Sequence, residues 1–337
     1  MRLFLLALFL VPCALHAQDD ATPFTLRSQT SVVLVPAQVQ TKKGEVIYGL
    51  KPEQFLLTDN GVAQKIRVDE DVDAQGLSLV VVVQCSRAAI MEAQKTRGLG
   101  EMIDDLTGGA PHEVALVSYG SEPELLTNFT SRPQKLADAI GQLQPCEDDG
   151  GAAHLDAVAF ANKLLERRDE QIALDPRIKR YRHAIVLIGE TRDHGSKAKP
   201  ADVIAALGRS NTVLDAVAFS PGKTEILNDL HYGGGSGPMG LLVMAVNALK
   251  KNVPHTLASL SGGEYTNFTT QNGFDAGLHR LSNHIHNYYL LSFQPAASNT
   301  PGMHHLELKI PDYPDAQIRS RMSYYAGDAP APDVAGK

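Results

Sequence analysis

The residues best suited to chemistry lie in the segment Gln84-Cys85-Ser86-Arg87-Ala88, which places a thiol, a hydroxyl and a guanidinium side by side. An adjacent arginine favours the reactive thiolate of a cysteine, and a serine or cysteine nucleophile also needs a histidine within reach. The chain has no Gly-x-Ser-x-Gly elbow, the turn that presents a nucleophile after a strand. A hydrolase that uses Cys85 or Ser86 is therefore the least favoured of the functions considered.

Histidines near the carboxyl terminus raise the question of a zinc site. No His-Glu-x-x-His motif and no companion cysteine cluster accompany them. Two of them, His284 and His286, are two residues apart and so do not share a helix face. We interpret the whole set as structural or surface residues. The set is His279, His284, His286, His304 and His305.

The segment 84–88 directly follows a run of apolar and β-branched residues, 77–83. A run of this kind is typical of a strand that is covered on both faces, as in a parallel sheet with helices on each side. Open α/β sheets bind their ligands at the loops that follow the carboxyl ends of such strands. We therefore expect the segment 84–88 to lie at a ligand-binding edge.

From residue 77 onward, strand and helix patterns alternate, which predicts an α/β fold with a doubly wound, mostly parallel sheet and right-handed crossovers. The two Asn-Phe-Thr motifs at 128–130 and 267–269 match a glycosylation pattern, and we interpret them as turns. The expected strands are 77–83, 113–119, 183–188 and 212–219. The expected helices are 90–106, 132–143, 153–168, 200–209, 239–261 with a break at Pro254, and 273–286.

Both ends of this α/β region, 76–286, have β patterns, in residues 25–74 and 287–326. Asn60-Gly61 predicts a tight hairpin, because both residues tolerate positive φ. Neither segment has enough strands to close a core alone. We expect the two to pair into a small β-sandwich-like domain, with the α/β domain inserted between them.

Residues 1–17 have the charged start, short apolar run and small residues of a secretory signal peptide, and residues 327–337, rich in Ala and Pro, predict a disordered tail. No later apolar segment reaches the roughly 18 residues of a membrane span. These features predict a secreted or periplasmic protein that has no transmembrane anchor after signal removal.

Composition narrows the class of partner. The net charge of -7 is spread without long runs, which argues against nucleic-acid binding, because such binding depends on clustered Lys and Arg. Tryptophan is absent and aromatic residues make up 6%, so a platform for stacking sugars is not evident.

The order of these pieces resembles a family of secreted bacterial proteins with a von Willebrand factor A-related domain, defined in Acidobacteria. The resemblance covers nearly all of the mature chain and implies the type A fold, whose members are mostly binding modules. In that fold a divalent metal completes its coordination with a carboxylate from the partner. The matching stretches are Gly49-Leu50-Lys51-Pro52-Glu53-Gln54-Phe55, Asp59-Asn60-Gly61-Val62-Ala63-Gln64, Gly150-Gly151-Ala152-Ala153-His154-Leu155-Asp156-Ala157, Leu260-Ser261-Gly262-Gly263-Glu264-Tyr265, Tyr288-Tyr289-Leu290-Leu291-Ser292-Phe293-Gln294-Pro295 and Arg319-Ser320-Arg321-Met322-Ser323-Tyr324-Tyr325.

The resemblance also implies where a metal ion would bind. The type A ligands are an Asp and two Ser on the first loop, a Thr on the second and an Asp on the third. Ser86 with Glu190 or Asp193 would be the remaining oxygen donors, which is a weak set for Mg²⁺ or Ca²⁺. We therefore expect a degenerate metal site and no cofactor. The ligand positions fall on Gln84, Ser86, Ala88, Ala152 and either Glu190 or Asp193.

Two cysteines remain after signal removal, Cys85 in the first loop and Cys146 before the second. These loops are neighbours in the type A fold, so a disulfide that holds them together is one interpretation and two free thiols the other. The acidic pair Asp148-Asp149 near the same edge would suit a cationic partner, or is simply a solvated loop.

The resulting functional prediction is a non-enzymatic protein-binding module of the adhesion type, which contacts a protein partner through loops at the carboxyl edge of the α/β sheet. The alternative is a structural or assembly component of an envelope or surface complex that uses its terminal β strands.

Overall fold

The computed structural model describes residues 32–69, 75–89, 99–175, 180–219, 237–296, 300–327 and 331–332. The expected signal peptide at 1–17, most of the expected tail at 327–337 and the start of the helix expected at 90–106 lie outside the described residues.

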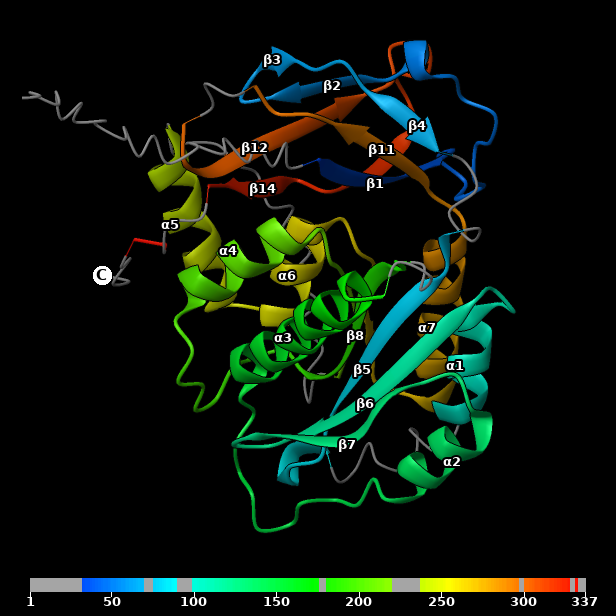
Figure 1. Ribbon diagram of the computed structural model, residues 1–337, viewed down its shortest axis with the longest axis vertical. Coiled ribbons are helices and arrows are strands. Elements are labelled where there is room, and N and C mark those ends of the chain that lie inside the picture. The colour runs from blue at the N-terminus through cyan, green and yellow to red at the C-terminus, as the bar shows by residue number, and fades with distance from the viewer. Residues whose placement is uncertain are drawn as a thin grey trace, which may run out of the picture. The chain divides into compact units, whose positions relative to one another are not determined.

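The centre of the fold is a six-stranded sheet with the order β10-β9-β8-β5-β6-β7. Figure 1 labels four of these strands, β8, β5, β6 and β7. All neighbouring pairs are parallel except β6 and β7, which are antiparallel. This α/β fold with a mostly parallel sheet confirms the prediction from strand and helix alternation. The strands are β5 (Leu77–Gln84), β6 (His112–Tyr119), β7 (Pro123–Thr130), β8 (Arg182–Glu190), β9 (Val213–Phe219) and β10 (Tyr265–Phe268).

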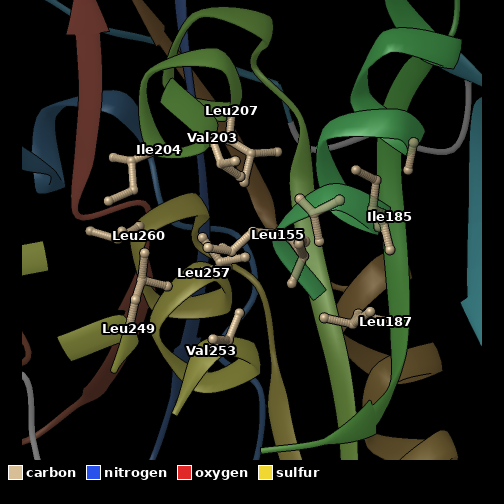
Figure 2. Close-up of a cluster of buried hydrophobic side chains, with 14 of the residues drawn as sticks. Leu155, Ile185, Leu187, Val203, Ile204, Leu207, Leu249, Val253, Leu257 and Leu260 are labelled. Atoms are coloured by element: carbon tan, nitrogen blue, oxygen red, sulfur yellow. The ribbon is translucent and has the colours of Figure 1, made fainter. Parts of the chain in front are cut away.

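Helices cover both faces of this sheet (Figure 1). Side chains alternate along a strand, so Val80 and Val82 of β5 join the hydrophobic cluster on one face, whereas Leu79 and Val81 join the cluster on the other. Figure 2 shows part of the first cluster, where β8 packs against α3, α4 and α6. Helices α3 (His154–Ala173), α4 (Pro200–Ser210), α5 (Gly237–Leu249) and α6 (Val253–Ser261) contribute to the first cluster. Helices α1 (Leu99–Thr107), α2 (Pro133–Gly141) and α7 (Gln271–His286) contribute to the second.

Two strands correct the interpretation of the motifs at 128–130 and 267–269 as turns. Residues 128–130 end β7, and residues 267 and 268 end β10. Neither strand has a run of buried apolar residues, because each pairs on one side only and lies at an edge of the sheet. β7 also carries register shifts against β6, which interrupt the simple alternation of a strand.

Two four-stranded sheets combine strands from both ends of the chain, with the orders β13-β1-β11-β4 and β14-β12-β2-β3. β1 pairs with β11 and β2 pairs with β12, both antiparallel. Apolar residues of both sheets form one buried cluster. The strands are β1 (Val33–Gln40), β2 (Leu56–Asp59), β3 (Val62–Ala63), β4 (Arg67–Asp69), β11 (Tyr289–Phe293), β12 (Gly302–Lys309), β13 (Gln317–Ser320) and β14 (Ser323–Ala326).

The hairpin predicted at Asn60-Gly61 joins β2 to β3. Asn60 has a φ of 48° and Gly61 a φ of 84°, so both occupy the left-handed region that a tight hairpin of this kind requires. This local prediction is therefore confirmed.

Charged residues, of which Arg321 and Glu264 are buried, join the small sheets to the α/β region. Arg321 is 1% exposed, and its Nη2 donates to the carbonyl oxygen of Thr212 at 3.0 Å. Burial lowers the pKa of Arg321 to about 10. Arg319 forms an ion pair with Glu264. A Cβ on Gly262 would lie 2.5 Å from the backbone nitrogen of Arg321, so only glycine permits this close approach.

A buried hydrogen-bonded group ties the first β segment to the last. His304 Nδ1 lies 2.7 Å from Asp59 Oδ1, and the Tyr324 hydroxyl donates to Asp59 Oδ2 at 2.7 Å. The other ring nitrogen of His304 lies 2.7 Å from the Thr300 carbonyl oxygen. Burial disfavours the charged ring, but the hydrogen bonds to Asp59 and Thr300 outweigh burial and raise the pKa of His304 above its ordinary value of 6.5.

We predict that His304 stabilises the fold more at mildly acidic than at alkaline pH. Because its folded-state pKa is raised, the stabilisation is complete below the unfolded value of about 6.5 and is lost as pH rises through the folded value. Urea unfolding of wild type and His304→Gln should therefore show a larger difference in unfolding free energy at about pH 6 than at about pH 8.5. The exposed His279→Gln is the control, and a difference that grows with pH would contradict the prediction.

Candidate functional site

Three segments meet at the carboxyl edge of the six-stranded sheet. We call them the first loop (residues 84–89), the second loop (residues 142–153) and the third loop (residues 190–198). The backbone nitrogen of Cys146 donates to the carbonyl oxygen of Cys85 at 2.7 Å. Ala152 and His194 exchange two backbone hydrogen bonds of 2.9 Å each. The second loop is thus bonded to both of the others through main-chain groups.

The Gln84 carboxamide links the first loop to the third. Its Nε2 donates to Ser86 Oγ at 2.8 Å and to Glu190 Oε1 at 2.9 Å. Its Oε1 accepts from the backbone nitrogen of Glu190 at 2.8 Å. Gln84 is only 4% exposed, so these bonds form away from solvent. The amide group therefore lies between the two oxygen donors that the sequence identified as possible metal ligands.

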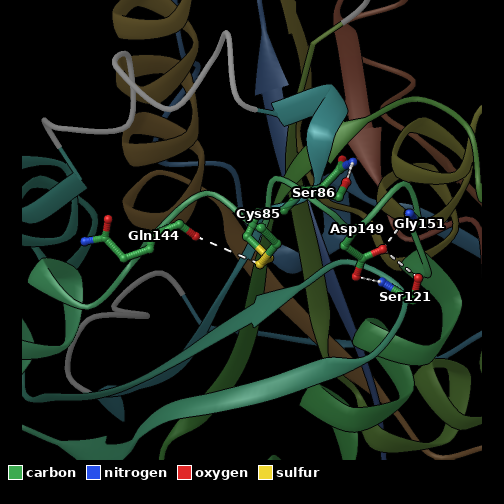
Figure 3. The surroundings of a disulfide bond; sticks show 8 residues. Cys85, Ser86, Ser121, Gln144, Asp149 and Gly151 are labelled. Atoms are coloured by element: carbon green, nitrogen blue, oxygen red, sulfur yellow. Dashed lines mark hydrogen bonds between the residues drawn. A yellow bond between two sulfur atoms is a disulfide. The ribbon is translucent and has the colours of Figure 1, made fainter.

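A disulfide joins the first and second loops. Cys85 and Cys146 are bonded, with their Cα atoms 5.1 Å apart, which is within the usual range for disulfides (Figure 3). Of the two interpretations of these cysteines, the disulfide is confirmed. It also means that the sulfur of Cys85 is not a free thiol in this structure.

The other residues at the expected ligand positions have different surroundings. Ser86 is fully buried. Ala88 lies in the short 3-10 turn Arg87–Ala89. Ala152 is fully buried and pairs through its backbone. Glu190 ends β8 with its side chain 17% exposed, and its Oε2 lies 3.8 Å from His194 Nε2.

Asp193 is used to complete the start of α3. Its Oδ1 accepts from the backbone nitrogen of Leu155 at 3.2 Å and from Ser196 Oγ at 2.5 Å. Ser196 Oγ also accepts from the backbone nitrogen of Asp156 at 3.3 Å. The residue that precedes α3, Ala153, has no side-chain oxygen to cap the helix. The third loop therefore supplies the oxygens that satisfy the first turn of α3.

Two further residues of the site, Tyr119 and His154, are buried, and no sequence motif predicts a role for either. The ring nitrogens of His154 each lie 2.7 Å from a carbonyl oxygen, that of Ala152 for Nδ1 and that of Glu190 for Nε2. Its ring packs edge-on against Tyr119, with centroids 5.4 Å apart. His154 belongs to the stretch 150–157, which matches the family resemblance, but only the fold reveals that it bridges the second and third loops.

The hydroxyl of Tyr119 is buried and has no hydrogen-bond partner among the described residues. Burial, together with the nearby charges of Glu190 and Asp193, raises the pKa of Tyr119 well above 10.0. Because burial and, to a smaller extent, the neighbouring carboxylates disfavour a phenolate, Tyr119 is a neutral phenol beneath the loops.

The expected acidic pair at 148–149 divides into two roles. Asp149 Oδ1 accepts from Ser121 Oγ at 2.6 Å and from the backbone nitrogen of Gly151 at 2.7 Å, and its Oδ2 accepts from the backbone nitrogen of Ser121 at 2.7 Å (Figure 3). These bonds, led by that from the Ser121 hydroxyl, lower the pKa of Asp149. Asp149 thus fixes the second loop against the segment after β6, whereas Asp148 is exposed.

Within the described part of the chain, no group of three or more His, Cys, Asp and Glu side chains is placed to hold a metal ion. The same residues include no helix that is both long enough and apolar enough to cross a membrane.

Comparison with known proteins identifies the α/β region. Residues 85–191 match the family model of the von Willebrand factor type A domain, from the first loop into the third. A von Willebrand factor type A domain is therefore present in this chain. No curated protein gave a significant match to the sequence.

Several solved structures resemble the chain at low sequence identity. Proximal thread matrix protein 1 from the mussel byssus is 11% identical with a TM-score of 0.41, and the match covers 75% of this chain but only 50% of that one. BatB from Bacteroides thetaiotaomicron is 14% identical with a TM-score of 0.42, over 62% of this chain and 97% of that one. The SpRpn10 VWA domain is 14% identical with a TM-score of 0.38, and the match covers 61% of this chain and 93% of that one.

We predict that removing the disulfide destabilises the protein without changing its fold. The bond closes a loop with a sequence separation of 61 residues, and the chain-entropy relation gives about 4 kcal/mol for a loop of that size. Urea unfolding of wild type and a Cys85→Ala/Cys146→Ala variant should show a loss of this order. Peptide mapping without reduction should recover Cys85 joined to Cys146, and two alkylatable thiols would refute the bond.

Proposed function

We propose that this chain is a protein-binding module whose type A domain contacts its partner through the three loops, without a metal ion. The observation that carries this proposal is the position of the Gln84 carboxamide. Its amide hydrogens face Ser86 Oγ and Glu190 Oε1, the two oxygens that a cation would otherwise need. A cation placed there would meet an NH₂ group, which cannot serve as a ligand.

The other donors do not fit a metal ion either. Ala88 and Ala152 have no side-chain oxygen, and Asp193 accepts hydrogen bonds from the start of α3 and from Ser196. One carboxylate, that of Glu190, is left, and with the buried Ser86 hydroxyl it makes a weak donor set for Mg²⁺, which requires near-ideal octahedral geometry. This donor set supports a degenerate adhesion site of the kind that the family resemblance implied.

The loops offer a binding surface that is already ordered. Hydrogen bonds, the disulfide and Asp149 hold them in one arrangement, so binding would cost little loop entropy. Exposed charged side chains lie on this edge and give it both signs of charge. They are Arg87, Glu122, Glu147, Asp148 and Lys197.

We further propose that the module is not an enzyme. Cys85 is in a disulfide, Ser86 is fully buried, and both ring nitrogens of His154 face carbonyl oxygens. None of these groups is free to act as a nucleophile or base on a bound substrate. This arrangement supports a binding role.

We also propose that the protein is exported from the cytoplasm and that its type A domain is inserted into a β-sandwich-like domain. A disulfide persists in oxidising compartments, which supports export to the periplasm or the medium. The shared apolar cluster of the two small sheets supports a β-sandwich-like domain into which the type A domain is inserted. This organisation agrees with membership of the acidobacterial-type family.

We predict that Mg²⁺, Ca²⁺ and Mn²⁺ leave the melting temperature of the wild-type protein unchanged and give no stoichiometric heat in calorimetry. The matched variant is Gln84→Asp, which places two carboxylates around Ser86. Like charges this close destabilise each other unless a cation lies between them, so Mg²⁺ should raise the melting temperature of this variant. Tight stoichiometric binding by the wild type that Glu190→Gln removes would overturn the metal-free proposal.

We also predict that the loops, not the terminal strands, carry partner binding. Immobilised wild type should retain a specific protein from an extract of the native cell envelope, and an Arg87→Ala/Glu147→Ala/Asp148→Ala variant should lose it. The control, Glu307→Ala/Lys309→Ala, alters an exposed ion pair on β12 and should retain it. If the control loses the protein and the loop variant keeps it, the terminal sheets make the contact instead.

A further inference from the structure

A polar cavity lies away from the three loops, at the opposite edge of the six-stranded sheet. Its volume is about 460 Å³, which is in the range of sites for small molecules. It is lined by the start of β6, the end of β7, the start of α2, the C-terminal half of α3 and Tyr181. None of the residues that line it belongs to the proposed partner-binding edge.

One wall of the cavity holds a cation in a fixed position. Arg168 donates from Nε to Glu113 Oε1 at 2.8 Å and from Nη2 to Glu113 Oε2 at 2.8 Å. Glu113 is 8% exposed and also accepts a bond of 2.7 Å from the Ser78 hydroxyl. A buried ion pair adds little net stability compared with apolar packing, so its main effect here is to orient the guanidinium. Among the described residues, Arg168 Nη1 contacts only Gln171 Oε1, at 3.4 Å, and it keeps capacity for another acceptor.

Two more cations lie at the mouth of the cavity. Arg132 and Lys135 are exposed, and their side chains form no ion pair or hydrogen bond with the described residues. The lining therefore has three permanent cations against one carboxylate, in a chain whose net charge is -7. Cations that converge on a cavity in an acidic protein favour an anionic ligand.

The remaining lining gives the ligand a shape. Phe129 and Tyr181 contribute aromatic surface, and Thr130 contributes a hydroxyl that can donate or accept. A mainly polar lining that also includes some aromatic surface suits an organic molecule with an acid group better than a bare inorganic ion. From these features we propose that the cavity binds a small organic anion, with its carboxylate or phosphate group held by Arg132, Lys135 and Arg168.

The proposal is tested by isothermal titration of the full chain at low ionic strength with citrate, glucose 6-phosphate and, as a neutral comparison, glucose. At least one of the two anions should bind at a single site, and glucose should not. Binding of citrate would identify a carboxylate as the group held in the cavity, and binding of glucose 6-phosphate would identify a phosphate. Lys135→Glu should weaken binding about tenfold or more, because it removes a charge-assisted contact and adds a repulsive charge.

The matched control is Lys163→Glu, which makes the same change of charge at an exposed lysine of α3 outside the cavity lining. It should bind as the wild type does, and melting temperatures of both variants should show that they are folded. The proposal is overturned if neither anion binds the wild type. Equal weakening by the two variants would also overturn it, because that result would show only a general effect of charge. Neither result bears on the loop edge, where partner capture is measured separately.

Discussion

The Gln84 carboxamide forms three hydrogen bonds at the end of β5, and the arrangement of the loop edge depends on them. An amide both donates and accepts, so one side chain satisfies Ser86 Oγ, the Glu190 carboxylate and the Glu190 backbone nitrogen together. An aspartate at this position would offer acceptors only and would face Glu190 with a like charge, which a cation would have to neutralise. The amide therefore satisfies this edge by itself, at a position where a carboxylate would favour a cation.

The loops around this amide are held by interactions of different kinds. The Cys85–Cys146 bond and the bonds of Asp149 fix the second loop, whereas Asp193 and Ser196 fix the third against α3. The second loop is also bonded to both of the others through main-chain groups. A surface ordered in this way suits recognition of a partner by shape and charge, which is how a type A domain without a metal ion would have to bind.

The loop edge and the cavity beside Arg168 lie at opposite ends of the parallel strands. At the loop edge, Glu190 and its acidic neighbours are mixed with Arg87 and Lys197. In the cavity, the cations Arg132, Lys135 and Arg168 outnumber the one carboxylate. Parallel strands create this separation, since the loops after them and the loops before them emerge at different edges. The two sites that we propose, one for a protein partner and one for a small anion, therefore do not overlap.

The sequence by itself determined the elements of this protein. The run 77–83, the alternation that follows it and the Asn60-Gly61 turn predicted strands, helices and a hairpin, because they depend on local propensity and periodicity. The edge strands β7 and β10 were missed, since neither has a continuous run of buried apolar residues. The family resemblance placed the ligand positions of a type A domain on Gln84, Ser86, Ala88, Ala152 and Glu190 or Asp193. Only the tertiary structure decided what those residues do. That the Gln84 amide reaches Glu190, that Cys85 joins Cys146, and that His154 bridges two loops are facts about residues far apart in the chain, and their contacts exist only once the sheet has brought the strand ends together.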